Sequence, residues 1–267
     1  MKHQDITAAF QDVDRSDADF LIQFLVDANR IPSVVESFQT QLKMLEIRPG
    51  DRVLDIGCGI GERAAQMAEF VGADGKVVGT DLSSLMVEAS ESRYGNSGLP
   101  LEFYVADACD HPFPDASFDR IRTERVLMYI KDLDAAFAEF RRLLKDGGKL
   151  LVVDFVWDSI VFSHSNKDLT RRITQFLCDS FPSGRIGADL FRIFKDLGFR
   201  DINVKPIGYL GQLELTKRVC GGVIQTGVEE NVFTATEVEE WWAELEQDDR
   251  DGKYFMSYTG YIIVGTK

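Results

Sequence analysis

The chain has 267 residues, of which 45% are hydrophobic and 28% charged, so it can bury a full core as one large α/β domain. Its net charge of -14 and its pI near 4.7 argue against a nucleic-acid partner, because nucleic-acid-binding proteins concentrate positive charge. The four scattered cysteines show no metal-ligand spacing, which predicts neither a disulfide framework nor a metal site. No apolar run is long enough to predict membrane insertion, and the acidic N-terminal segment favours a cytoplasmic protein.

The first 45 residues are predicted to be helical. Apolar residues recur every three to four positions between residues 5 and 30, which is typical of an amphipathic helix, and a second helical stretch runs from Val34 to Leu45. Two interpretations remain open: these helices cover one face of a sheet, or they close over a site. We assign residues 1–45 to a helical lid.

A glycine-rich turn follows the apolar strand at residues 53–56. Its glycines, which allow positive φ and close approach to a ligand, are Gly57, Gly59 and Gly61. Such a turn at a helix N-terminus suits the anionic part of a nucleotide-type cofactor. Glu62 occupies the last glycine position of a dinucleotide fingerprint and would repel a pyrophosphate, whereas Asp55 can face a cationic amine. An NAD-dependent oxidoreductase remains the alternative.

Residues 55–61 read Asp-Ile-Gly-Cys-Gly-Ile-Gly and resemble the first motif of the class I S-adenosylmethionine-dependent methyltransferases, Asp-x-Gly-x-Gly-x-Gly. The resemblance implies an α/β fold with a doubly wound, Rossmann-like sheet of seven mostly parallel strands, of which the last is antiparallel. It also implies S-adenosyl-L-methionine as the cofactor and places Cys58 beside it.

The next two strands also end in acidic residues. Residues 76–80 predict a strand ending in Asp81, about twenty residues beyond the turn, where a carboxylate can accept the ribose hydroxyls of a nucleoside. Asp81 can also be interpreted as a helix N-cap, and Leu82 adjoins it. After the third strand, the resemblance places Asp107 and Ala108 against the adenine, with the carboxylate accepting from its amino group.

Residues 120–123 predict a fourth strand with unusually few apolar side chains. The resemblance implies that Thr123 and Glu124, at the end of this strand, flank the methionine part of the cofactor. Met128 and Tyr129 follow on the same segment, near the transferred methyl. Many relatives carry histidine where Tyr129 stands, so this chain departs from the family at that position; Tyr129 is one candidate general base.

The cofactor-binding core is predicted to span residues 46–155, and residues 156–184 and 208–253 are interpreted as cap insertions. Residues 156–184 follow the carboxyl end of the fifth strand and should therefore lie above the ligand crevice. His164 in this segment is the second candidate base. The apolar residues assigned to an acceptor pocket are Phe20, Phe24, Met128, Trp157, Phe162 and Phe181.

These observations favour methyl transfer from S-adenosylmethionine to a small-molecule acceptor. Residues 118–127 and 155–158 resemble bacterial methyltransferases related to the ubiquinone and menaquinone enzymes, which implies a quinone-like, terpenoid or other secondary-metabolite acceptor. A protein that binds S-adenosylmethionine without catalysis is a further alternative. The sequence predicts no oligomeric state.

Overall fold

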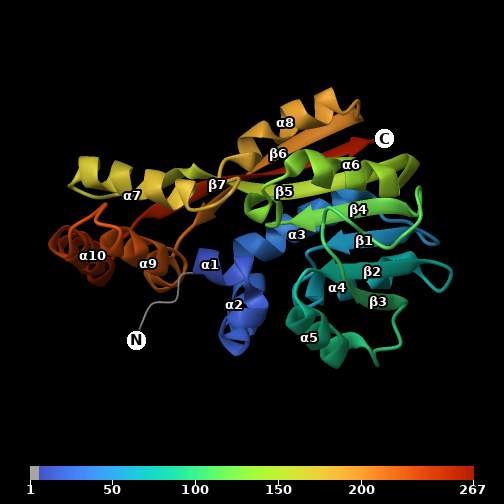
Figure 1. Cartoon of the computed structure of the whole chain (residues 1–267), viewed down its shortest axis with the longest axis horizontal. Coiled ribbons are helices and arrows are strands. Elements are labelled where there is room, and N and C mark those ends of the chain that lie inside the picture. The colour runs from blue at the N-terminus through green and yellow to red at the C-terminus, as the bar shows by residue number, and fades with distance from the viewer. Residues whose placement is uncertain (1–5) are drawn as a thin grey trace.

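A seven-stranded sheet with the order β3-β2-β1-β4-β5-β7-β6 forms the centre of the computed structural model, which describes residues 6–267 (Figure 1). Strands β1 to β5 pair in parallel, whereas β7 is antiparallel to both of its neighbours, β5 and β6. The strands are β1 (Arg52–Ile56), β2 (Lys76–Asp81), β3 (Leu101–Val105), β4 (Phe118–Glu124), β5 (Leu144–Phe162), β6 (Arg200–Leu210) and β7 (Met256–Thr266). The predicted Rossmann-like sheet with a reversed last strand is thereby confirmed.

Helices cover both faces of this sheet (Figure 1). Helices α3, α4 and α5 share one face, and α6, α7 and α8 pack on the other. The bounds are α1 (Ile6–Gln11), η1 (Val13–Arg15), α2 (Ala18–Asn29), α3 (Pro32–Leu45), α4 (Glu62–Val71), α5 (Ser84–Tyr94), η2 (Leu127–Tyr129), α6 (Leu133–Leu143), α7 (Lys167–Asp179), α8 (Ile186–Asp196), α9 (Leu213–Glu229) and α10 (Ala235–Arg250).

The side chains of β5 show how one strand serves two cores. Leu150 and Val152 belong to the apolar cluster under α6 and α8, whereas Leu151 and Val153 belong to the cluster under α3 and α4. Successive side chains of a strand point to opposite faces, so a continuous apolar run is what a doubly covered strand requires. This arrangement leaves the carboxyl ends of the strands as the edge where a ligand site can form.

The N-terminal helices are divided more finely than the sequence suggests. The single helix expected over residues 5–30 is split into α1, η1 and α2, and Asp17 caps α2 by accepting a hydrogen bond from the Phe20 amide at 3.1 Å. Residues 1–5 of the expected lid lie outside the described part of the chain.

The two expected cap insertions are only partly separate from the sheet. β5 continues to Phe162, and after a bulge between Val156 and Val161 its end still pairs with β7. β6 likewise takes in residues 208–210. Helix α7 follows β5, and α9 and α10 connect β6 to β7; α9 packs against α1, α7 and α10 (Figure 1). Strand pairing therefore continues several residues beyond the expected boundaries at 155 and 208.

Candidate cofactor and acceptor site

A cavity of about 610 Å³ lies at the carboxyl ends of the strands, bordered also by α2 and by residues of α9. This volume falls within the range of small-molecule sites. Most of the residues predicted for the site line this cavity, namely Phe24, Asp55, Gly57, Cys58, Gly59, Asp81, Leu82, Asp107, Ala108, Glu124, Met128, Tyr129, Trp157 and Phe181.

The glycine turn connects β1 to α4 with a left-handed backbone. Gly57, Gly59 and Gly61 have φ values of +69°, +55° and +75°. A Cβ on Gly57 would lie 2.2 Å from a methyl of Val126, so this glycine lets the turn approach the segment after β4. Gly61 does not line the cavity: it is the N-cap of α4, and a Cβ there would lie 2.7 Å from the ring of Phe103. Its role in the structure is packing.

Asp81 joins the end of β2 to the glycine turn. Its Oδ2 accepts a hydrogen bond from the Gly59 amide at 2.9 Å, and its Oδ1 accepts from the Ser83 amide at 3.0 Å. Each oxygen can accept a second hydrogen bond, and burial raises the pKa of Asp81. Ser83 is the N-cap of α5, since its hydroxyl accepts from the Met86 amide. The carboxylate thus has capacity to accept from the two hydroxyls of a ribose.

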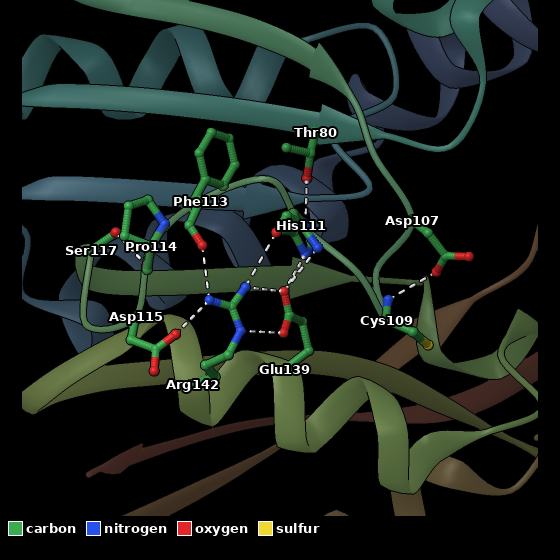
Figure 2. A network of polar contacts seen from close by, with 10 residues as sticks. All are labelled: Thr80, Asp107, Cys109, His111, Phe113, Pro114, Asp115, Ser117, Glu139 and Arg142. Atoms are coloured by element: carbon green, nitrogen blue, oxygen red, sulfur yellow. Dashed lines mark hydrogen bonds and ion pairs between the residues drawn. The ribbon is translucent and has the colours of Figure 1, made fainter.

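The connection from β3 to β4, residues 106–117, carries Asp107 and contains no helix. A polar network shown in Figure 2 fastens it to α6. Arg142 donates to both oxygens of Glu139, at 2.7 and 2.6 Å, and to the carbonyl of Phe113 at 2.8 Å. Glu139 in turn accepts from the His111 amide at 2.8 Å. The network fixes the segment that would contact an adenine.

His111 completes this network from inside the fold. Its Nε2 lies 3.2 Å from the Thr80 hydroxyl at the end of β2, and burial lowers the pKa of the ring. Asp107 is exposed and keeps one carboxylate oxygen available. Its Oδ1 accepts a hydrogen bond from the Cys109 amide at 2.8 Å, so Oδ2 remains for a ligand (Figure 2).

A buried ionic cluster lies beneath the other end of the cavity. Asp55 on β1 is fully buried, and its Oδ1 accepts from Arg122 on β4 at 2.7 Å. Arg122 also pairs with Glu124 and donates to Gln41 at 2.8 Å. Sequence reasoning missed Arg122, although charged residues in a strand covered on both faces were a signal for it.

This cluster changes the role expected for Asp55. Its charge was predicted to face a cationic amine, but in the structure that charge is already paired with Arg122. Oδ2 of Asp55 has no hydrogen-bond partner among the described residues. A contact between this oxygen and the amine of a methionine moiety stays a prediction.

Aromatic rings from β5, β6, β7 and the segment before α8 line part of the cavity. Trp157 stacks on Phe181 with centroids 4.5 Å apart and on Tyr258 at 5.9 Å, and Tyr258 stacks on Tyr209 at 5.1 Å. The ring of Phe155 stands edge-on to Trp157 at 5.8 Å. Trp157 and Phe181 were expected here, whereas the rings from β6 and β7 were missed because the sequence does not show which strand ends reach the site.

The short helix η2 places Met128 and Tyr129 at the cavity. Asp154, in the middle of β5, accepts from the Met128 amide at 3.3 Å, and the Met128 carbonyl accepts from the Ser183 amide at 3.0 Å. The Tyr129 ring lies 5.6 Å from the ring of Phe181. Tyr129 is therefore held next to the aromatic wall.

His164 is not part of the site. Its Nδ1 accepts from the Asn166 amide at 2.9 Å, so Nε2 carries the proton that reaches the Trp241 carbonyl at 3.2 Å. The ring is buried and stacks on Trp241, outside the cavity lining. The prediction that His164 is a base is wrong, because one ring nitrogen is hydrogen-bonded to the N-cap residue of α7 and the other to α10, outside the cavity lining.

Three further predicted residues also lie outside the lining. Phe162 packs edge-on against Trp241 at 5.0 Å, and Phe20 lies beside the guanidinium of Arg218 at 5.5 Å. Thr123 is 1% exposed, and its hydroxyl makes no hydrogen bond with the described residues. The extra length of β5 carries Phe162 away from the crevice.

Comparison with known proteins assigns the family. A family model described as a methyltransferase domain matches residues 54–152. The chain is 39% identical over 181 residues to the ubiquinone/menaquinone biosynthesis C-methyltransferase UbiE of Cupriavidus metallidurans, covering 66% of this chain and 74% of that protein. The chain belongs to the class I S-adenosylmethionine-dependent methyltransferases. This membership confirms the predicted cofactor, S-adenosylmethionine, and decides against the NAD-dependent alternative.

Two other similarities extend beyond the matched core. The chain is 33% identical over 230 residues to an uncharacterized 37.1 kDa protein in transposon TN4556 of Streptomyces fradiae, covering 84% of this chain but 64% of that protein, less than two thirds of its length. The crystal structure of the YcgJ protein from Bacillus subtilis has the same fold, with a TM-score of 0.61 at 21% identity over 87% of this chain and 98% of that one.

Within residues 6–267, no helix is both long and apolar enough to cross a membrane.

Proposed function

We propose that this protein transfers a methyl group from S-adenosylmethionine to a small, largely apolar and planar acceptor. The observation that carries this proposal is that the glycine turn, Asp81 and the stacked rings around Trp157 line one and the same cavity. A nucleoside end and an aromatic end within one cavity suit a cofactor and an acceptor that meet between them.

The residues present fit this cofactor. Asp81 has free acceptor capacity for the ribose hydroxyls, and the exposed Leu82 offers an apolar surface to one side of the adenine. Asp107 and Ala108 would contact the adenine edge, while the left-handed turn at Gly59 and the paired carboxylates below would accommodate the zwitterionic methionine end. When bound, S-adenosylmethionine supplies a sulfonium methyl that an acceptor lone pair takes by in-line displacement.

The protein's own contribution would be mainly positional. Holding two reactants in line supplies as much as ~7 to 11 kcal/mol of a barrier. Tyr129 is the proposed base for an acceptor that must lose a proton, because it lines the cavity beside Phe181. A quinone-like acceptor is supported by the similarity to the Cupriavidus metallidurans enzyme and by the flat, stacked geometry of the aromatic wall.

The test is incubation of the purified protein with methyl-labelled S-adenosylmethionine and fractionated small metabolites, followed by mass identification of labelled products. We expect the labelled methyl group to appear in a small organic molecule. A control reaction without the protein should give no labelled product. Label in tRNA, DNA or a protein side chain instead would contradict the small-molecule acceptor. Tight binding of S-adenosylhomocysteine with no labelled product in any fraction would favour the non-catalytic binder.

A further inference from the structure

Arg125 lines the cavity that also contains the glycine turn, Asp81 and the stacked rings around Trp157. It directly follows β4 and has a left-handed backbone with φ of 60°. Its amide donates to the Val153 carbonyl at 2.9 Å, which fixes the backbone in this conformation. Such a conformation is uncommon for a residue with a side chain, and it is maintained where the surrounding structure enforces it, often at functional sites.

The other two arginines of this region are occupied. Arg122 is fully engaged with Asp55, Glu124 and Gln41. Arg63 donates to the Asn29 carbonyl at 3.1 Å, and its guanidinium lies over the ring of Phe38. Both guanidiniums are buried and hydrogen-bonded to protein groups, although the buried Nε of Arg63 has no hydrogen-bond partner among the described residues.

Arg125, in contrast, has weak protein contacts. Its Nη2 reaches Asn29 Oδ1 at 3.4 Å, and its Nε lies 3.7 Å from a Glu124 carboxylate that already pairs with Arg122. Within the described part of the chain, no hydrogen bond is made by Nη1. The side chain is 22% exposed, so a guanidinium with spare donors faces the cavity.

The surroundings of Arg125 are aromatic. Arg125 lines the same cavity as Tyr209 and Tyr258, the stacked pair that continues the Trp157 wall. The Tyr209 hydroxyl is buried near Ser37 but makes no hydrogen bond of ordinary geometry. A ligand lying flat on these rings would thus share the cavity with a guanidinium that has unused hydrogen-bonding capacity.

We infer that Arg125 binds a carboxylate carried by a planar ring acceptor; the inference rests on the proposed function and narrows its substrate class. A guanidinium presents paired N–H donors that match the two oxygens of a carboxylate. One arginine with spare donors at the cavity suits a singly charged group, because Arg63 and Arg122 are both buried and already hydrogen-bonded to protein groups. The aromatic wall holds the ring, and Arg125 sets which edge of it faces the methyl donor.

The test uses two flat probes of equal shape, 2-naphthoate and 2-naphthamide, titrated into the S-adenosylhomocysteine-saturated protein by calorimetry. We expect the carboxylate to bind at least tenfold more tightly than the amide. Arg125→Gln should abolish this preference, and Arg125→Lys should restore part of it. Lys167→Gln, which removes an exposed positive charge on α7 outside the cavity lining, should leave the preference intact. Equal binding of the two probes, or no binding of naphthoate, would overturn the inference.

A second measurement separates an acceptor carboxylate from that of the cofactor. Arg125→Gln should leave the affinity for S-adenosylhomocysteine within about twofold of the parent protein. If the variant instead loses affinity for S-adenosylhomocysteine but keeps that for 5′-methylthioadenosine, which lacks the amino-acid end, Arg125 binds the cofactor and the inference fails. Neither titration requires turnover. The naphthoate preference therefore tests the role of Arg125, whereas the labelling experiment tests methyl transfer, and either can fail without the other.

Discussion

Asp55 on β1 and Arg122 on β4 form an ion pair of 2.7 Å inside the sheet, with side-chain exposures of 0% and 4%. Arg122→Met should destabilise the protein by about 3 to 5 kcal/mol, because it leaves buried carboxylates without their counter-charge. Urea unfolding measures this free energy. Arg171→Met breaks the exposed pair with Asp168 and should change stability little. Equal effects of the two substitutions would show that the buried pair is not needed for stability.

Gly61 and Gly147 have similar backbone angles but different surroundings. Their φ values are +75° and +78°, yet a Cβ on Gly61 would lie 2.7 Å from Phe103, whereas nothing lies within 4 Å of one on Gly147. Gly147→Ala should cost about 1 to 2 kcal/mol for the left-handed backbone. Gly61→Ala adds overpacking of about 1 to 3 kcal/mol, and should cost roughly 2 to 5 kcal/mol. Thermal unfolding of both variants compares them, and equal losses would rule out the steric explanation.

The parallel part of the fold was predictable because its strands are short apolar runs separated by glycine and polar turns. Residues 53–56 and 76–80 are confirmed as strands, and Asp81 and Asp107 fall at their expected places at one edge of the sheet. Parallel strands place their carboxyl ends together, so local patterns sufficed to assemble much of the cofactor side.

The features that the sequence did not predict depend on which strands pair and in what register, and local sequence patterns do not determine this. Asp55 pairs with Arg122 because the register of β1 against β4 places these two residues side by side. The length of β5 follows from its continued pairing with β7, which carries His164 away from the cavity. Tyr258 reaches the site for a similar reason, because β7 runs between β5 and β6.

Asp154 should make stability depend on pH. Complete burial raises its pKa to about 7, against roughly 3.9 in an unfolded chain. The folded state therefore holds a proton that the unfolded state releases, so this residue's contribution falls as pH rises between those values and levels off above about 7. Asp154→Asn should accordingly gain stability relative to the parent protein as pH is raised.

Urea unfolding of both proteins between about pH 5 and about pH 8 measures this difference. Comparing the two at each pH cancels the opposite effect of His111, whose burial lowers its pKa and so favours folding as pH rises toward about 6.5. A stability difference that does not vary with pH would mean that Asp154 titrates normally.

Tyr129→Phe should lower turnover by roughly 100 to 10,000-fold if the acceptor must lose a proton, because it removes a general base. Affinity for S-adenosylhomocysteine should stay nearly unchanged, since the base acts on the acceptor. His164→Asn is the control, and its turnover at a temperature where it is folded should match the parent protein. Full activity of the Tyr129 variant would show that positioning alone is sufficient.

The most direct test of the cofactor site is calorimetric titration of the parent protein and Asp81→Asn with S-adenosylhomocysteine and with NAD⁺. The substitution keeps the shape of Asp81 but removes the charge that would accept the ribose hydroxyls, and hydrogen bonds to charged groups contribute about 1.5 to 3 kcal/mol. We predict that the parent binds S-adenosylhomocysteine and not NAD⁺, and that the folded variant binds it at least tenfold more weakly. Unchanged affinity in the variant, or preferential binding of NAD⁺, would contradict the proposed site.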